Sequence, residues 1–412
     1  MLAGFDPLSK EQVGEPFELL AKARHELPVF YVPSLDVWCV TRMEDVLAVF
    51  KDTESYSNTH EEVGLPPAEF VDRIPAGHPV SHSLDAMDPP DHTRLRKLAQ
   101  KAFTPRQLAA REPEIRNICM ALVDEFIDLG EVDLVEAFTG RIPARVIAGV
   151  LGLDQEFAPT MKRWTDDWFA IWMGDDSQEM LRTRWERTIE FDGFIRKFVE
   201  ERRARPQDDL TSALVHAKSD DGDPSMTTSE VISVIAGIVA AGSDTTSILL
   251  AYAFWLMLTH PDTWEAVKAD PSQIPAAVEE TLRLRNPVRG LRRVTTKETT
   301  LGGVTVPEGA TLYVHVGSAN RDEKVFDHPE EFRPGRPGIS DHVGFGRWTH
   351  FCLGAPLARI EARIAIECVA ERLPSLQLSG NQGELEYVTN AVVPAVEHLF
   401  VAWSPAPVGA AG

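Results

Sequence analysis

The sequence predicts a mainly α-helical fold with a minor β part, arranged as a single domain. Apolar residues recur at three- and four-residue spacing over most of residues 92–285, which is the period of helices packed against a core. Short runs rich in Val, Tyr and Trp at 29–42, and β segments punctuated by Pro and Gly at 286–350, predict a smaller amount of strand. We find no internal repeat and no Gly/Ser-rich linker. We therefore expect one domain over 1–403 and a flexible C-terminal tail over 404–412.

Composition narrows the possible functions. Of the 412 residues, 43% are hydrophobic and 25% are charged, which is ordinary for a globular protein with a large core. The 41 basic and 63 acidic residues give a net charge of −22, which repels nucleic-acid phosphates and anionic membranes. No run approaches about 18 uninterrupted apolar residues, and the N-terminus shows no secretion signal. We expect a cytoplasmic protein with neither nucleic acid nor membrane as a partner.

The longest helix is expected to run through the core, because both of its flanks are apolar. Thr227 and Glu230 fit a capping box at its start, and Pro261 ends it.

In chain order, the expected elements are a helix at 16–27, two strands within 29–42, a loop at 60–84, helices over 92–285 that include the long one at 227–260, short strands and turns at 286–350, a helix at 355–373, and a strand-like end.

The centre of the long helix reads AGSDTT at 241–246, a run of weak helix formers around an ionisable side chain. Burying Asp244 costs stability unless the carboxylate is paired or used. Two interpretations remain open from the residues alone. The segment is either a local kink with satisfied side chains or a groove where a small ligand meets a hydroxyl–carboxylate pair.

Four cysteines occur at scattered spacings, without the pattern of a zinc site or a redox pair. Cys352 differs from the others because it lies in a Gly-containing loop just before the helix expected at 355–373. Free N–H groups and partial positive charge at a helix start favour a thiolate. Such a thiolate is a good ligand for a soft metal or for haem iron. From spacing alone, a buried structural cysteine is the alternative.

Four motifs, found in the appropriate order, resemble those of the cytochrome P450 family. The loop FGRWTHFCLG (345–354) resembles the haem-binding signature F-G-x-G-x-H-x-C-x-G, and AGSDTT resembles the oxygen-activation motif of the long helix. ETLR (280–283) matches E-x-x-R, and PEEFRPGR (329–336) resembles the segment that supplies a second arginine. The resemblance extends from about 15 to 400 and implies the cytochrome P450 fold, with a long central helix across a haem b cofactor (iron protoporphyrin IX).

The resemblance also implies a role for each matching residue. Cys352 is the axial thiolate and sole metal ligand, and Asp244 and Thr245 form a catalytic acid–alcohol pair that delivers protons to dioxygen. Glu280 and Arg283 form a structural triad with Arg336, for which Arg333 is the alternative. The remaining cofactor-binding positions are His92, Arg96 and Arg293 at the haem propionates, Ala241 and Gly242 beside the dioxygen site, and Phe345, His350 and Gly354 in the cysteine loop.

One residue departs from the family pattern, which usually has Gly where this chain has Trp348. Glycine permits a tight turn there, so the loop backbone must adapt, and the indole could cover the sulfur side. This substitution puts the geometry and redox tuning of the loop in doubt, but not the ligand itself.

Several positions are expected to line the substrate pocket. Strand alternation would direct Arg289 and Leu291 to the same side as Arg293. Arg289 could pair with a substrate carboxylate, reach a propionate or exit to solvent. Ile238 lies one helical turn before Gly242, so it is expected on the same face of the long helix and in the wall of the pocket. Further expected wall positions are Ala241, Val288, Val392 and Val393, with aromatic residues near Trp168, Phe169 and Trp172.

These implications give an expected function: a haem-thiolate monooxygenase that inserts one atom of O2 into a small aromatic or hydrophobic substrate. The reaction would be hydroxylation or oxidative O-dealkylation. The alternatives are a peroxide-driven peroxygenase and a haem-thiolate ligand sensor. The chain lacks a flavin or iron–sulfur signature, so electrons would come from a ferredoxin or flavodoxin-type partner, or from a fused reductase domain.

A cluster of basic residues offers a docking surface for that partner. Six basic residues and no acidic ones lie between Arg94 and Arg111, an unusual density in a chain of net charge −22. The resemblance places this segment on the same side as the cysteine loop. The residues expected to steer an acidic electron donor are Lys97, Lys101, Arg106 and Arg347. The alternative is a solvated helix face.

Overall fold

The computed structural model describes residues 2, 4–59, 66–73, 83–173, 177–218, 225–388 and 390–404. Nearly all of the expected tail and part of the expected loop at 60–84 lie outside these ranges. The chain divides into two compact units, each assembled from segments distant in sequence. The first unit comprises 1–56, 112–142 and 244–412, and the second comprises 57–111 and 143–243. This division falls within the range that the sequence analysis treats as one domain.

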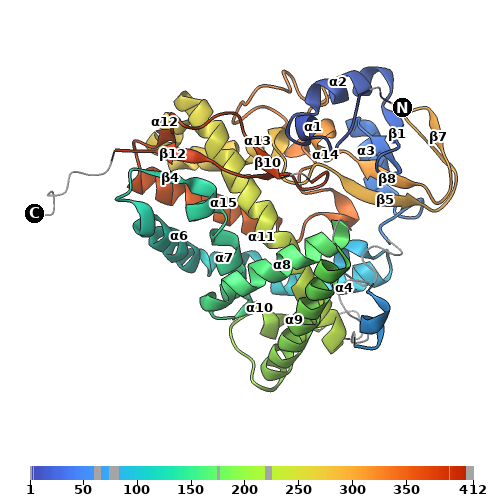
Figure 1. Cartoon of the computed structure of the whole chain (residues 1–412), viewed down its shortest axis with the longest axis horizontal. Helices are drawn as coiled ribbons and strands as arrows, with labels where there is room; N and C mark the ends of the chain where they lie inside the picture. Colours follow the sequence, from blue (N-terminus) through green and yellow to red (C-terminus); the bar gives the residue numbers. More distant parts are fainter. Residues whose placement is uncertain are drawn as a thin grey trace, which may run out of the picture. The chain divides into compact units, whose positions relative to one another are not determined.

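The first unit contains the main sheet, whose strand order is β1-β2-β8-β5-β3 (Figure 1). Strands β1 and β2 form an antiparallel hairpin, β2 pairs in parallel with β8, and β8 pairs antiparallel with β5. The strands span β1 Val29–Val32, β2 Val37–Val40, β3 Tyr56–Ser57, β5 Leu291–Thr295 and β8 Thr311–Val314.

Both faces of this sheet are covered because successive residues of a strand point to opposite sides. Val29 belongs to a buried cluster with Val46 and Phe50 of α3 (Met43–Lys51). The next residue, Phe30, belongs to a second cluster with Phe17 and Leu20 of α2 (Phe17–Glu26). The expected helix at 16–27 and the two expected strands are therefore present.

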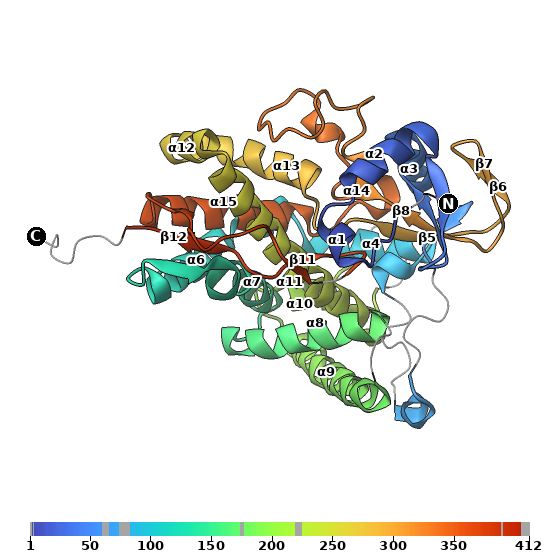
Figure 2. The same cartoon turned by 45° about the horizontal axis from the view of Figure 1, so that its top comes forward.

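Helix α15 (Ala355–Arg372), which follows the cysteine loop, packs against both α6 and α13 in the same unit (Figures 1 and 2). The other helices of this unit are α1 Lys10–Gly14, α6 Glu112–Phe126, α12 Pro261–Ala269, α13 Ile274–Leu284 and α14 Val316–Ala319.

Three small antiparallel sheets complete the β part. The hairpin β6–β7 turns at Gly302 and Gly303, both of which have positive φ. Strand β12 pairs with β4 and β9, and β10 pairs with β11. The bounds are β4 Glu131–Asp133, β6 Thr299–Leu301, β7 Val304–Val306, β9 Gln377–Leu378, β10 Tyr387–Val388, β11 Ala395–Val396 and β12 Phe400–Ala402. The sequence analysis missed β4, because this strand carries no apolar alternation and exists through pairing with the far end of the chain.

The second unit is helical, and three of its helices begin with a side-chain cap. Thr104 and Gln107 form a capping box, and the side chains of Ser177 and Asp209 cap two further helices. Helices α8 and α9 pack together, with the rings of Trp164 and Phe191 5.0 Å apart. The helices are α4 Asp91–Ala102, α5 Pro105–Ala109, α7 Ile142–Leu151, α8 Ala158–Met173, α9 Gln178–Ala204 and α10 Leu210–Val215.

The long helix is α11 (Thr228–Thr259), whose 32 residues agree with the expected span. The predicted capping box is confirmed: the Thr227 N–H donates to Glu230 Oε2 at 2.8 Å, and the Glu230 N–H donates to Thr227 Oγ1 at 3.2 Å. Helix α12 starts at Pro261. Among the ranges covered by the structure, α11 alone is long and apolar enough to cross a membrane by length and composition, and 61% of its most apolar stretch is buried in the protein. Core helices of soluble proteins pass the same test, so this finding is weak evidence for a membrane span.

Candidate functional site

Cys352 lies in a loop held by backbone hydrogen bonds. Its N–H donates to the Phe345 carbonyl at 2.8 Å, and the Gly346 N–H donates to the Val343 carbonyl at 2.9 Å. Gly346 has φ +70°, a conformation that glycine adopts without the Cβ penalty. A Cβ on Gly354 would lie 3.9 Å from Cys352 Sγ, so this glycine backbone passes beside the sulfur. Helix α15 begins at the following residue, Ala355.

Cys352 is also the cysteine with access to a ligand. It is half-buried, whereas Cys39, Cys119 and Cys368 are fully buried, and none of the four is in a disulfide. Burial raises the pKa of the Cys39 thiol. Only Cys352 combines partial exposure with a helix start, which is the setting that stabilises a thiolate. The chemistry of this donor fits a thiolate ligand for haem iron.

Three residues that the sequence analysis did not identify anchor the cysteine loop. Glu279 of α13 accepts hydrogen bonds from Arg359 Nε at 2.6 Å and from His342 Nε2 at 2.9 Å. The Gly344 N–H donates to His342 Nδ1, which leaves the imidazole proton on Nε2, facing the carboxylate. The Arg359 guanidinium lies 4.6 Å from the centre of the Phe345 ring. Glu279 thus connects α13, the loop and α15.

The protonation of Glu279 makes this anchor sensitive to acid. Burial acts to raise its pKa, but hydrogen bonds from Arg359 and His342 outweigh burial and hold the pKa at about 2. A carboxyl group with a lowered folded-state pKa stabilises the protein above its unfolded pKa of about 4.3, and that stability is lost as pH falls toward 2. The contribution at neutral pH is about 3 kcal/mol.

We expect Glu279→Gln to lower the free energy of unfolding by about 3 kcal/mol at pH 7, with roughly two thirds of that difference left near pH 3.5. Urea unfolding of both proteins at the two pH values measures this. Glu298→Gln, at an exposed position, is the control, and its free energy of unfolding should stay close to that of the wild type at either pH. A difference between wild type and Glu279→Gln that does not vary with pH would contradict the argument.

Trp348 adopts the backbone conformation that its position in the motif suggests. Its φ is +53°, in the left-handed region, and 48% of the side chain is exposed. A left-handed conformation brings the Cβ of any residue other than glycine close to the following carbonyl oxygen. The sequence analysis expected the loop backbone to adapt around this residue, but the backbone keeps the left-handed conformation that glycine adopts without strain, and Trp348 occupies it.

Two substitutions at Trp348 separate backbone strain from loss of the indole. Both Trp348→Gly and Trp348→Ala remove the ring, but only alanine retains a Cβ in the left-handed conformation. We expect Trp348→Gly to be more stable than Trp348→Ala by about 1 kcal/mol in thermal or urea unfolding. Phe351, which is also exposed but has φ −53°, should show the opposite order. The same order at both positions would argue against strain.

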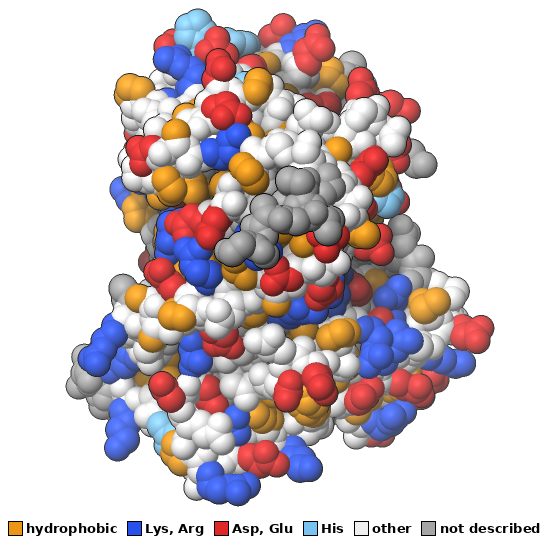
Figure 3. Space-filling model, turned by 90° about the vertical axis from the view of Figure 1, so that its left-hand side faces the viewer, with side chains coloured by type: hydrophobic (Ala, Val, Ile, Leu, Met, Phe, Trp, Pro, Cys, Tyr) orange, Lys and Arg blue, Asp and Glu red, His pale blue; other side chains and the backbone are white. Residues whose placement is uncertain are grey.

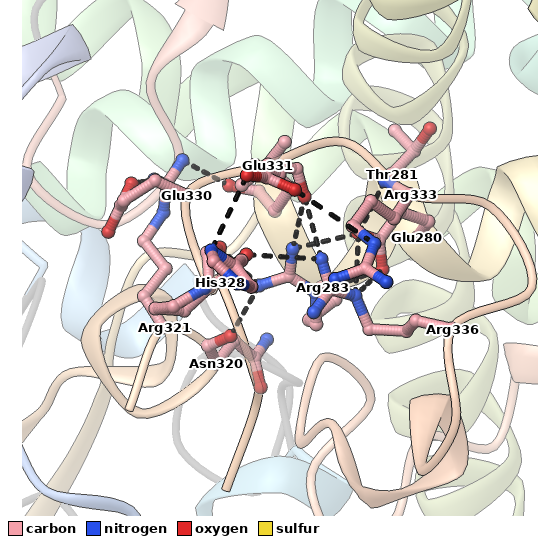
Figure 4. A network of polar contacts seen from close by, with 12 residues as sticks. Glu280, Thr281, Arg283, Asn320, Arg321, His328, Glu330, Glu331, Arg333 and Arg336 are labelled. Carbon is pink, nitrogen blue, oxygen red and sulfur yellow. Dashed lines mark hydrogen bonds and ion pairs between the residues drawn. The ribbon is translucent and has the colours of Figure 1, made fainter. Parts of the chain in front are cut away.

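Glu280 is the centre of a buried network (Figure 4). Its carboxylate accepts hydrogen bonds from Arg283 Nε and Nη2 at 2.9 and 2.8 Å and from Arg336 Nε at 2.8 and 3.0 Å. Glu280 and Arg283 are fully buried. Arg333, the alternative partner, contributes its backbone N–H at 2.9 Å instead of its guanidinium. Breaking such a buried pair on one side typically costs about 3–5 kcal/mol, so this network supports the fold.

The centre of α11 remains helical throughout 241–246. The Ser243 hydroxyl donates to the Val239 carbonyl of the previous turn at 3.1 Å. Gly242 has a packing role, because a Cβ there would lie 2.7 Å from Cδ1 of Ile147. The neighbouring Ala241 is exposed within a largely buried helix, and both Asp244 and Thr245 are half-buried.

Of the three basic side chains expected at the haem propionates, His92 and Arg293 are buried and Arg96 is half-buried. On α4, His92 is 1% exposed, and burial together with the nearby Arg96 lowers its pKa to about 4. This lowered pKa favours the neutral imidazole, whose N–H can act as a hydrogen-bond donor. Arg293 of β5 is 6% exposed, and its guanidinium lies 5.5 Å from the centre of the Phe50 ring.

The segments containing Val288 and Val392 lie side by side, although they are about a hundred residues apart in sequence. The Arg289 N–H donates to the Val392 carbonyl at 2.7 Å. Val392 is partly exposed, whereas Val393 packs beside the buried cluster of Ile248 and Tyr252. These wall positions therefore come together in the first unit. Ile238, in the second unit, is half-buried. The side chains of Trp168, Phe169 and Trp172 lie outside the described set.

Arg289 corrects one expectation. It precedes β5, which begins at Leu291, so strand alternation with Arg293 does not extend to it. Its side chain does not exit to solvent, since it is 2% exposed. Nη2 donates to the Gly14 carbonyl and to the Tyr252 hydroxyl, both at 3.2 Å, and the guanidinium lies 4.7 Å from the centre of the Phe17 ring.

Comparisons with known proteins agree with this geometry. The family model described as "Cytochrome P450" matches residues 9–394. The chain is 33% identical over 391 residues to 6-deoxyerythronolide B hydroxylase of Saccharopolyspora erythraea, covering 93% of this chain and 95% of that protein. It superposes on cytochrome P450 CYP109Q5 from Chondromyces apiculatus with TM-score 0.88 and 32% identity, over 98% of this chain and 100% of the other. Cytochrome P450 CREJ, solved in complex with (4-ethylphenyl) dihydrogen phosphate, gives the same TM-score, identity and coverage.

Proposed function

Because the chain belongs to the cytochrome P450 family, and is therefore a haem-binding monooxygenase, we propose that it oxidises a small aromatic or hydrophobic substrate with electrons from a separate protein. The reaction is hydroxylation or oxidative O-dealkylation. The observation that carries this proposal is the half-buried Cys352 at the start of α15, in a loop anchored by Glu279.

The residues present fit haem b (iron protoporphyrin IX). Cys352 would supply the axial thiolate, within a loop that also contains Phe345, His350 and Gly354. His92, Arg96 and Arg293 would hold the propionates, for which charge-assisted hydrogen bonds from arginine are the strong type. When bound, the thiolate-ligated haem supplies the reductive activation of dioxygen.

The long helix supplies the proton chemistry. The Thr245 hydroxyl holds and delivers the protons consumed when the O–O bond breaks, and the Asp244 carboxylate resupplies Thr245 from solvent. The half-burial of both side chains supports this assignment, because each can exchange protons with water while facing a partly protected space. Ala241, exposed on the same helix, leaves room for dioxygen.

We propose an apolar substrate cavity whose walls include Ile238, Ala241, Val288, Arg289, Leu291, Val392 and Val393. The contact between the Val288 and Val392 segments supports this grouping in the first unit. The CREJ structure with a substituted phenyl phosphate supports an aromatic substrate class. A screen of aromatic compounds by the shift in haem spin state tests it. A screen in which only aliphatic compounds shift the spin state would contradict the aromatic proposal.

One comparison tests the reaction class against the alternatives. Product is expected with reduced ferredoxin and dioxygen. Product formed only with added peroxide would indicate a peroxygenase. Reversible ligand binding with no product under either condition would indicate a haem-thiolate ligand sensor.

We propose that a ferredoxin or flavodoxin-type donor in the cytoplasm docks at the basic residues of α4 and α5. Lys97, Lys101 and Arg106 are exposed. Over the face seen in Figure 3, Lys and Arg side chains are mixed with Asp and Glu, whereas 94–111 contains six bases and no acid. Arg94, by contrast, is paired with Glu230. Arg347 is the corresponding candidate in the cysteine loop, where it lies 3.5 Å from Asp341.

Replacing Lys97, Lys101 and Arg106 with Glu should slow ferredoxin-driven haem reduction by about tenfold or more at low salt, with a smaller effect at high salt. Stopped-flow reduction at two ionic strengths measures this, and dithionite reduction and substrate affinity are the controls. The same reversal at Lys22, an exposed lysine on α2, should have little effect. Wild-type ferredoxin kinetics in the triple variant at low salt would place the docking site elsewhere.

A further inference from the structure

A cavity in the first unit is lined by residues other than those assigned to the active site, although the guanidinium of Arg289, a proposed substrate-pocket residue, belongs to the same cationic cluster. Its volume is about 550 Å³, within the range of small-molecule sites. Phe17 and Trp255 contribute aromatic walls, and Arg285 and Arg321 contribute guanidinium groups. The cavity thus combines apolar surface with convergent cationic groups.

The cationic side of this cavity is buried and crowded. Arg285 and Arg321, together with Arg289 behind them, are 9%, 3% and 2% exposed. Their guanidinium carbons lie 5.6, 3.6 and 4.7 Å from the centre of the Phe17 ring. Nε of all three, and Nη1 of Arg289, have no hydrogen-bond partner in the described protein. Burial and the neighbouring charges of Arg285 and Arg289 lower the pKa of Arg321 well below its ordinary value.

The carboxylates that offset these charges are fewer and lie near solvent. Glu15 pairs with Arg285 and Glu330 pairs with Arg321, and each glutamate side chain is 54% exposed. Figure 4 shows Glu330 beside Arg321 at the margin of the Glu280 network. Glu331 also lines the cavity, but its carboxylate pairs with His328 and Arg333. Glu15 and Glu330 are therefore the carboxylates that pair with the buried guanidinium groups. Because partly exposed ion pairs contribute little stability, a ligand anion can replace either glutamate at small cost.

We propose that this cavity binds a small aromatic carboxylate. The ligand carboxylate takes the place of Glu15 or Glu330 on Arg285 and Arg321, and its ring lies against Phe17 and Trp255. The planar guanidinium fork matches a carboxylate in shape and charge. The Arg285 guanidinium already lies 5.1 Å from the centre of the Trp255 ring, so one ligand can contact both the cation and the aromatic wall.

Calorimetric titration of the haem-containing protein with 2-naphthoate tests the proposal, with 2-naphthamide as the neutral match and inorganic phosphate as the bare anion. We expect 2-naphthoate to bind about tenfold more tightly than either. Arg285→Met should weaken 2-naphthoate binding by about tenfold, while Arg372→Met, which removes an arginine paired with Asp124 elsewhere, leaves it unchanged. The part of the binding that Arg285→Met weakens should leave the haem absorption spectrum unchanged.

The exposed glutamates supply a test that does not depend on disturbing a buried arginine. Glu15→Gln combined with Glu330→Gln removes the competing carboxylates and should raise 2-naphthoate affinity by about threefold or more. Equal binding of 2-naphthoate and 2-naphthamide, or unchanged 2-naphthoate affinity in the double glutamine variant, would overturn the proposal. A haem spectral shift that follows 2-naphthoate binding equally in wild type and in Arg285→Met would also overturn it, by placing the ligand at the haem.

Discussion

Cys352→Ser is expected to abolish the thiolate-type absorption spectrum of the reduced carbon monoxide complex. A serine hydroxyl lacks the soft sulfur donor that we propose as the ligand of haem iron at this position. Cys352 is the half-buried cysteine at a helix start, and its N–H is tied to the Phe345 carbonyl. The measurement is a difference spectrum of dithionite-reduced protein with and without carbon monoxide.

The other three cysteines are the matched controls for this experiment. Cys39, Cys119 and Cys368 are each fully buried in the protein core. Serine at any of them should lower stability, because a hydroxyl group is less favourable than a thiol in an apolar site. The thiolate-type spectrum should remain. An unchanged spectrum in Cys352→Ser would refute the ligand assignment and the active site built on it.

Thr245→Ala is expected to retain substrate binding and haem reduction but to divert electrons to hydrogen peroxide. Without the hydroxyl that we propose as the proton donor, ordered proton delivery to dioxygen would be lost, and hydrogen peroxide would form in place of product. Product formed per electron consumed should fall by about tenfold or more, in line with the usual contribution of one positioned proton donor.

The adjacent threonine provides the control. Thr246 is buried and lies one residue further along the same helix, on a different face. Thr246→Ala should leave the ratio of product to electrons close to wild type. If Thr245→Ala formed as much product per electron as the wild type, Thr245 would have no role in proton delivery. Substrate titration by spin state in both variants separates loss of coupling from loss of binding.

Much of the fold and part of the candidate site follow from local pattern. The limits of α11 could be predicted because its capping box acts between Thr227 and Glu230, three residues apart. The suitability of Cys352 as a haem ligand also follows from short-range features, namely neighbouring glycines and the start of α15. Each feature depends on residues within one or two helical turns, where the chain itself fixes the geometry.

Other features depend on contacts between distant segments. The choice of Arg336 over Arg333 as the side-chain partner of Glu280 is made across 56 residues, by how residues 327–336 fold back on α13. The only sequence signal for Glu279 is its position beside Glu280 in an acidic pair, which does not reveal contacts with His342 and Arg359. The orientation of the Arg289 side chain depends on where the Gly14 carbonyl and the Tyr252 hydroxyl lie.

The sequence by itself determined the helical class, the long helix and the cysteine loop, since period, caps and glycine positions are local properties of the chain. The tertiary structure alone decided which charged groups are buried together. Arg285, Arg289 and Arg321 are hardly distinguishable from surface arginines in the sequence, yet all three surround Phe17. The physical reason is that the burial and pairing of a charge are set by the segments packed around it, which for these arginines include residues near the N-terminus.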